Sequence, residues 1–129
     1  MKRPRTGERR PVKSYDWRHV QALGAGPRFI DEPRERECPV CGNIAVRTYM
    51  YASDRGPGRE TVISYTWCAS CGHFTGNTGP RPAGLRFTDP LAALSRADRI
   101  DMESDSDLFF RKLDRLWDSG ELPQRFERV

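Results

Sequence analysis

The stretch ECPVCGNIAVRTYMYASDRGPGRETVISYTWCASCGHFTG, residues 37–76, holds all four cysteines of this 129-residue chain. They form two Cys-x-x-Cys pairs, each followed by glycine, with 26 residues between Cys41 and Cys68. In such a loop both sulfur atoms point at one centre, and the glycine tolerates the positive φ that a tight loop often needs. Two loops of this kind place four thiolates in a tetrahedron, the ligand set of structural zinc. The candidate metal ligands are therefore Cys38, Cys41, Cys68 and Cys71.

Two strand patterns lie between the cysteine pairs. Residues 44–53 and 60–67 are rich in β-branched and aromatic residues, which are typical of strands. The six residues 54–59, Asp-Arg-Gly-Pro-Gly-Arg, have the composition of a turn. We therefore predict a β-hairpin, whose antiparallel strands return the chain to its start and bring the two pairs together. Period-two alternation places two groups of large side chains on shared faces, Tyr49 with Tyr51, and Ile63 with Tyr65 and Trp67.

The knuckles at 38–42 and 68–72, with the hairpin between them, resemble the zinc-ribbon superfamily. The resemblance covers about 40 of the 129 residues. It implies a small three-stranded β unit built on a structural Zn²⁺. It does not imply a single function, because zinc ribbons serve as nucleic-acid binders, transcription factors, ribosomal proteins and docking modules in larger assemblies.

Other uses of the cysteines stay open beside structural zinc. Rubredoxin-type iron has the same four-cysteine layout, although resemblance to rubredoxin usually puts proline in the second knuckle and here Pro39 lies in the first. A thioredoxin-like redox pair needs a βαβ setting, which the sequence lacks. His73, just beyond the second knuckle, is an additional candidate ligand beside a complete cysteine set. Structural disulfides are disfavoured in the reducing cytoplasm, where we expect this chain to reside.

The flanking sequence predicts helices and connecting segments, and the whole chain is expected to be α+β: a small antiparallel zinc-ribbon sheet with a C-terminal helical extension packed on it. Ser14 is a candidate cap for a short helix over 14–23 that ends at Gly24. Ser95 is a candidate cap for a second helix ending near Met102, and Ser106 for a third that ends at Gly120. The predicted organisation is a disordered basic arm (1–13), a short helix and linker (14–36), the ribbon (37–76), a loop (77–94), the helical extension (95–122) and a tail (123–129).

The third helix carries an apolar stripe of Phe109, Leu113 and Leu116, with Phe110 and Trp117 beside it. This stripe needs a partner, and the aromatic face of the hairpin is the largest one available. We therefore predict that Tyr49, Tyr51, Tyr65 and Trp67 pack against the helix. The alternative is that these rings are exposed and stack on nucleic-acid bases.

Charge is distributed unevenly along the chain. The net charge is +4, yet residues 1–18 carry +5 and residues 89–121 carry −4. The basic arm and the hairpin supply candidate nucleic-acid contacts: Arg3, Arg5, Arg9, Arg10, Lys13, Arg47, Arg55 and Arg59. The acidic run supplies candidate contacts to a basic protein partner: Asp101, Glu103, Asp105 and Asp107. A solvated tail and solvated helix starts are the plainer explanations of these two runs.

The sequence carries no catalytic motif that we can identify. There is no Gly-rich phosphate loop, Gly-x-Ser-x-Gly or His-Glu-x-x-His sequence. Transcript-cleavage elongation factors carry adjacent acidic residues at a zinc-ribbon hairpin tip, but here Asp54 and Glu60 are separated by Arg55 and Arg59. The chain also lacks a run of 18 apolar residues, and its basic N-terminus has no apolar segment typical of a secretory signal. We expect neither a membrane partner nor a small-molecule substrate.

These observations predict a non-enzymatic zinc-ribbon binding protein. A nucleic-acid-binding accessory or regulatory factor is favoured, because of the basic arm. The alternative is a protein-binding adaptor or an immunity-type inhibitor that docks a basic partner, such as a nuclease toxin, through its acidic C-terminal helices.

Overall fold

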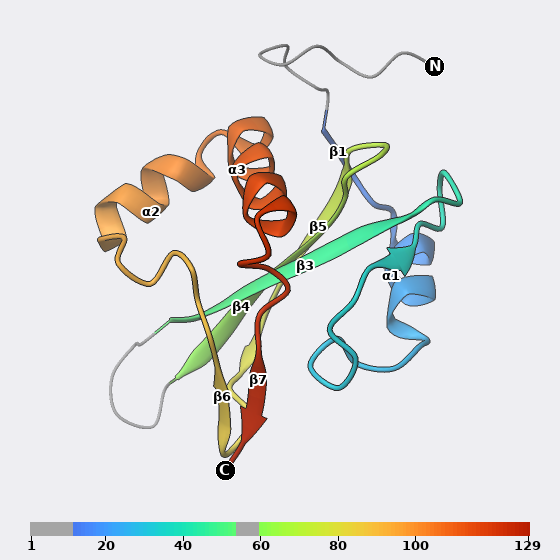
Figure 1. Ribbon diagram of the computed structural model, residues 1–129. Coiled ribbons are helices and arrows are strands. Elements are labelled where there is room, and N and C mark those ends of the chain that lie inside the picture. The colour runs from blue at the N-terminus through green and yellow to red at the C-terminus, as the bar shows by residue number, and fades with distance from the viewer. Residues whose placement is uncertain (1–11, 54–59) are drawn as a thin grey trace.

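The computed structural model describes residues 12–53 and 60–129 and has an α+β fold, as predicted (Figure 1). Within these residues the helices are α1 (Trp17–Gly24), α2 (Arg96–Glu103) and α3 (Ser106–Asp118). The strands are β1 (Lys13–Ser14), β2 (Arg36–Glu37), β3 (Ile44–Ser53), β4 (Thr61–Cys68), β5 (His73–Pro80), β6 (Leu85–Phe87) and β7 (Phe126–Arg128). The described strands form a main sheet in the order β1-β5-β4-β3-β2 and a small sheet of β6 and β7.

The predicted hairpin is confirmed by β3 and β4, which pair antiparallel with Tyr49 opposite Tyr65. Its tip, residues 54–59, lies outside the described part of the chain. The sheet differs from the predicted antiparallel ribbon in one respect, because β1 runs parallel to β5. The Lys13 N–H donates to the Gly72 carbonyl, and the Tyr15 N–H donates to the Phe74 carbonyl. The segment before the ribbon therefore becomes an edge strand of it.

One face of the main sheet is covered by α2 and α3, whereas α1 lies beside the start of β3 (Figure 1). The rings of Tyr65 and Phe109 meet edge to face with their centroids 5.0 Å apart, and Trp67 stacks on Phe110 at 5.6 Å. Only 1% of Trp67 is exposed, and Tyr49 is fully buried. The aromatic face therefore packs against the helix, as predicted, and it is not available for stacking on bases.

Of the three serines predicted as helix N-caps, only Ser95 is confirmed. Ser95 caps α2, and its hydroxyl accepts a hydrogen bond from the Asp98 N–H. Asp105, rather than Ser106, caps α3 by accepting from the Leu108 N–H. Asp16, rather than Ser14, caps α1, because Ser14 belongs to β1. A carboxylate and a hydroxyl suit the N-cap equally well, so neighbouring candidates cannot be ranked from sequence.

Gly120 has φ 84° directly after the C-cap of α3, in agreement with the predicted helix end. This left-handed conformation is easily adopted only by glycine. The chain then turns back toward the sheet, and the C-terminal segment pairs with β6.

Several segments that we expected to be irregular contain strands: Lys13 of the predicted arm belongs to β1, and Arg36 of the predicted linker belongs to β2. In the predicted loop 77–94, β5 continues to Pro80, which lies opposite Thr61 of β4. In the same loop β6 pairs with β7 of the predicted tail, and Phe87 lies opposite Phe126. Residues such as Gly76 and Asn77 have low intrinsic strand preference, so pairing with a neighbouring strand determines their conformation.

Candidate metal centre

The four cysteines converge on one point at the end of the sheet where β3 begins and β4 ends. All four Sγ atoms lie within 4.8 Å of one another. The Cys38–Cys71 and Cys41–Cys68 Sγ distances are both 3.7 Å. A tetrahedral ion with metal–sulfur bonds of about 2.3 Å has sulfur–sulfur edges of about 3.8 Å, whereas a disulfide needs about 2.05 Å. The cysteines are free thiols, and their spacing fits a bound metal ion.

Each knuckle has the predicted local geometry. Gly42 and Gly72 adopt φ angles of 77° and 80°. Their N–H groups donate to the carbonyls of Cys38 and Cys68, at 2.9 and 3.0 Å, and these bonds close the two loops. The Val40 N–H lies 3.4 Å from the Cys38 sulfur. A side chain at either glycine would strain the backbone, which explains why each Cys-x-x-Cys pair ends in glycine.

The two knuckles are also joined to each other directly. The Asn43 side-chain amide donates to the Ser70 hydroxyl at 2.9 Å and lies 3.5 Å from the Cys41 sulfur. The Ala69 N–H donates to the Ala45 carbonyl at 2.9 Å. These bonds tie the first knuckle to the second, so the ligand set is arranged by the protein as well as by any ion.

Two side chains outside the ligand set contact the thiols. The Tyr15 hydroxyl lies 3.1 Å from the Cys38 sulfur, and His73 Nδ1 lies 3.3 Å from the Cys71 sulfur. The Tyr15 and His73 ring centroids are 5.4 Å apart, so the two rings lie next to each other. In the described part of the chain the metal cluster comprises the four cysteines without His73. The geometry gives His73 a hydrogen-bonding position next to the ligands. Tyr15 gave no signal in the sequence, because 23 residues separate it from Cys38.

The thiols differ in their acidity. Burial raises the pKa of Cys38, but hydrogen bonds from Tyr15 and from the backbone N–H groups of Cys41 and Val40 outweigh this effect and bring the pKa down to about 7. Burial raises the pKa of Cys68 and of Cys71 above the ordinary thiol value. Metal coordination requires thiolates, so an ion has to displace protons from the buried thiols, and its apparent affinity must depend on pH.

Arg47, predicted as a nucleic-acid contact, is engaged within the protein. Its guanidinium donates to Glu35 at 3.1 Å and to Asp114 at 2.9 Å, and it lies over the Trp117 ring. Its side chain is 14% exposed, which leaves little of this charge for a phosphate. Of the other candidates Lys13 is exposed on β1. The remaining ones lie outside the described residues: Arg3, Arg5, Arg9, Arg10, Arg55 and Arg59.

The acidic run predicted to dock a partner is used mostly to build the fold. Glu103 accepts hydrogen bonds from the hydroxyls of Tyr51 and Tyr65, at 2.9 and 2.6 Å. Asp105 is the N-cap of α3. Asp107 is 7% exposed and pairs with Arg111 at 3.3 Å. Asp101 is exposed. Sequence reasoning missed the role of Glu103 because Tyr51 and Tyr65 lie 52 and 38 residues away along the chain, whereas Asp105 and Asp107 interact within one helical turn.

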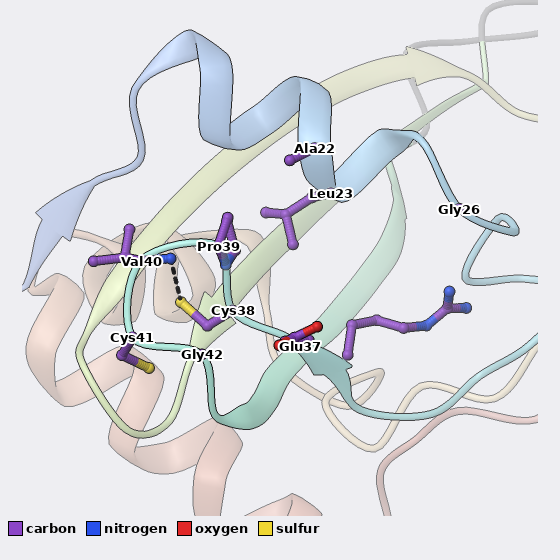
Figure 2. A pocket seen from close by; sticks show the side chains of 10 residues that line it. Ala22, Leu23, Gly26, Glu37, Cys38, Pro39, Val40, Cys41 and Gly42 are labelled. Carbon is purple, nitrogen blue, oxygen red and sulfur yellow. Dashed lines mark hydrogen bonds between the residues drawn. The ribbon is translucent and has the colours of Figure 1, made fainter.

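An open pocket of about 680 Å³ lies between α1 and the first knuckle (Figure 2). Figure 2 shows Ala22 and Leu23 of α1 above Pro39 and Val40 of the knuckle. The pocket also reaches the candidate ligand Cys41, which is exposed. The metal centre is therefore accessible from this side.

In comparisons with protein-family models, curated proteins and solved structures, nothing matches this chain. The likeness to zinc ribbons thus rests on the cysteine geometry and the hairpin. Among the described residues, no helix combines the length and the apolar character needed to cross a membrane.

Proposed function

We propose that this chain is a non-enzymatic zinc-binding protein in which the ion is structural. The observation that carries the proposal is the set of four cysteine sulfurs within 4.8 Å of one another. Four thiolates complete the usual shell of zinc, so no position is left for an activated water. Cys38, Cys41, Cys68 and Cys71 would hold the ion, which would supply folding free energy to the hairpin.

Metal analysis tests this proposal. Elemental analysis of the purified chain should find one zinc per molecule, and Cys68→Ser should abolish the bound metal. Ser64→Ala, an exchange on the same strand away from the ligand set, is the matched control and should retain it. Iron with visible absorption, or zinc well below one equivalent, would contradict the assignment.

We further propose that the protein binds nucleic acid through phosphate contacts, as an accessory or regulatory factor. Residues 1–18 carry a net charge of +5, and Lys13 is exposed on β1 beside the metal centre. Arg55 and Arg59 belong to the hairpin tip by sequence. The aromatic face is buried against α3, so recognition would use the phosphate backbone and little base stacking.

A salt series with a duplex and a single-stranded oligonucleotide tests this function. Log affinity should fall linearly with log salt, with a slope near one per phosphate contact. Replacing Arg9 and Arg10 by glutamine should reduce that slope by about two. Arg96→Gln, on the exposed start of α2, should leave the slope unchanged. No binding at ~50 mM salt would reject the nucleic-acid function.

A protein-binding adaptor is the second candidate, favoured by exposed apolar side chains around α1 and the first knuckle. Trp17 is 65% exposed, Ile44 70% and Val40 42%. A contiguous exposed apolar patch is a feature of protein interaction sites, and these three side chains would contribute to one. An adaptor would retain one stoichiometric partner, and Trp17→Ser should release it while the zinc content stays the same. The immunity-type alternative has less support, because Glu103, Asp105 and Asp107 are engaged within the fold.

A further inference from the structure

The metal centre receives a hydrogen bond from a segment that lies before the ribbon. Tyr15 is 6% exposed, and its hydroxyl is 3.1 Å from the Cys38 sulfur. Its ring belongs to the same small core as Cys38, Val46 and Cys68. The zinc-binding knuckles at 38–42 and 68–72 account for the ligands, but not for this contact.

Metal chemistry fixes the direction of this bond. A cysteine bound to zinc has lost its proton, so in the loaded protein only the tyrosine hydroxyl can donate. Hydrogen bonds to charged acceptors are stronger than neutral ones. Partners of metal ligands orient those ligands and tune their basicity, and their loss typically lowers metal affinity by about 10–100-fold.

Tyr15 is held at this position by the elements on either side of it. Before it, the Lys13 N–H donates to the Gly72 carbonyl at the end of the second knuckle. At Tyr15 itself, the backbone N–H donates to the Phe74 carbonyl at 2.8 Å. After it, Asp16 caps α1. The strand β1 is hydrogen-bonded to the second knuckle and thus places the Tyr15 hydroxyl next to Cys38 of the first knuckle.

Side chains of the segment 12–24 reach two places in the molecule: Val12 packs against the aromatic core, and Tyr15 and Leu23 contact the small core around Cys38. No residue of α1 is buried, and Leu23 is its partly buried contact with the small core around Cys38. Tyr15 is the most buried residue that this segment contributes to that core. The Tyr15 contact with Cys38 is therefore also the main side-chain anchor of this segment at the metal centre.

We propose that Tyr15 is a positioning residue for the metal ion and that it couples docking of residues 12–24 to metal occupancy. The proposal rests on the zinc site proposed above. Coupling between two binding events is reciprocal: the docked segment raises metal affinity, and the bound metal holds the segment in place. Loading with zinc would thereby fix the point from which the basic arm leaves the sheet.

The test compares Tyr15→Phe with Tyr51→Phe in the full chain. Both substitutions remove a buried hydroxyl that contacts a charged or ionisable acceptor, but Tyr51 contacts Glu103. Zn²⁺ affinity is measured by competition with a chromophoric chelator. Tyr15→Phe should bind Zn²⁺ about 10–100-fold more weakly than the unmodified chain, and Tyr51→Phe should stay within twofold of it. Equal affinities for Tyr15→Phe and the unmodified chain would overturn the proposal.

Two further readouts separate positioning from simple packing. With Co²⁺ as the probe, Tyr15→Phe should shift the thiolate-to-metal charge-transfer band to lower energy, because the Cys38 thiolate loses a donor. In the zinc-loaded variant, hydrogen exchange should become faster at the amides of Lys13 and Tyr15 and stay unchanged in β3 and β4. An unshifted band, or exchange that rises equally throughout the sheet, would show that Tyr15 acts through packing alone.

A second variant covers the case in which Tyr15→Phe does not fold. Lys13→Pro removes the N–H that bonds to Gly72 and leaves Tyr15 and every cysteine in place. It should also weaken Zn²⁺ binding several-fold, and unchanged affinity would overturn the coupling. If the unmodified chain itself bound no Zn²⁺, the proposed function would fail, which is distinguishable from a chain that binds Zn²⁺ without help from Tyr15.

Discussion

At the scale of single residues, Gln124 makes a contact that no local pattern indicates. It is 1% exposed, and its amide bonds to both the N–H and the carbonyl of Met50 and to the carbonyl of Thr88. All the hydrogen-bonding groups of this buried side chain are thus directed at backbone. A buried backbone group left without a partner costs about 1–3 kcal/mol.

Gln124→Leu should lower the free energy of unfolding by about 3 kcal/mol, because both Met50 groups lose their partner. Urea unfolding followed by circular dichroism measures the change. Gln21→Leu, on the exposed surface of α1, is the matched control and should alter stability by less than about 0.5 kcal/mol. Equal effects of the two substitutions would contradict the structural role of Gln124.

The predictable residues are those whose role depends on near neighbours in the chain. The convergence of the four cysteines could be predicted because each Cys-x-x-Cys-Gly sequence specifies both the tight loop and its two thiols within five residues. Tyr15 and Gln124 could not, because their partners are 23 and 74 residues away. Each of these side chains forms a hydrogen bond with a buried polar group far away in the chain. Such a contact leaves no periodic pattern in the sequence.

At the scale of elements, α2 has no buried residue; it is attached to the hairpin by Met102, which packs against the aromatic core, and by polar contacts. Glu103 accepts hydrogen bonds from Tyr51 and Tyr65. Arg99 lies 4.0 Å above the Tyr51 ring and donates to the Tyr49 hydroxyl. The acidic and basic residues of this helix therefore fix its position on the aromatic face.

Glu103→Gln should lower the free energy of unfolding by about 1 kcal/mol, because the two tyrosine hydroxyls exchange a charged acceptor for a neutral one. Asp101→Asn, an exposed carboxylate on the same helix, should have almost no effect. Chemical denaturation of the two variants gives the comparison. A larger loss for Asp101→Asn would show that the acidic run stabilises the fold in some other way.

The same contacts predict a dependence of stability on alkaline pH. Burial, the hydrogen bond to Glu103 and the charge of Glu103 raise the pKa of Tyr51 to about 12, and burial likewise raises the pKa of Tyr65. The folded-state pKa exceeds the unfolded value of about 10, so the folded state favours the neutral phenol. This contribution to stability is complete below pH ~10 and is lost as pH rises toward 12.

Titration of tyrosinate absorbance, together with urea unfolding at pH 8 and pH 11, measures this effect. Glu103→Gln should bring the Tyr51 titration closer to the ordinary tyrosine range, because the neighbouring negative charge is gone. Asp101→Asn should leave the titration unchanged. Ordinary titration of every tyrosine in the unmodified chain would contradict the buried contacts.

Elements were predictable where residue type and periodicity agree. The strands 44–53 and 60–67 and the stripe on α3 are of this kind, and β3, β4 and α3 match them closely. The strands β6 and β7 are three residues each and join segments about 40 residues apart in the chain. Their pairing depends on the whole fold, so the local sequence indicates only a loop and a tail.

At the scale of the whole molecule, the metal centre and the aromatic core lie at different places along one hairpin. The cysteines anchor the start of β3 and the end of β4, and the packing of Tyr49 and Trp67 against α3 anchors its middle. A structural zinc contributes on the order of 10 kcal/mol, which is comparable with the total stability of a typical domain, about 5–15 kcal/mol. The fold should therefore depend on the ion.

Removal of the metal with a chelator at mild pH should unfold the hairpin region. Circular dichroism before and after chelation measures this loss, and added Zn²⁺ should restore the spectrum. Mg²⁺ at the same concentration should not restore it, because it prefers oxygen ligands. An unchanged spectrum after complete removal of the metal would mean that the aromatic core alone maintains the fold.

The amide of Gln124 has a consequence for how copies of this chain behave together. β3 is ten residues long, but β2 pairs with it only near Val46 and Ile44. An uncovered strand edge is a template on which another chain can add a strand, which begins aggregation. The Gln124 side chain forms hydrogen bonds with both the N–H and the carbonyl of Met50, in the middle of that edge. It thereby takes the place that the backbone of a neighbouring strand would have. Loss of this one side chain should therefore leave that edge open and promote self-association of the chain at high concentration, even where the chain remains folded.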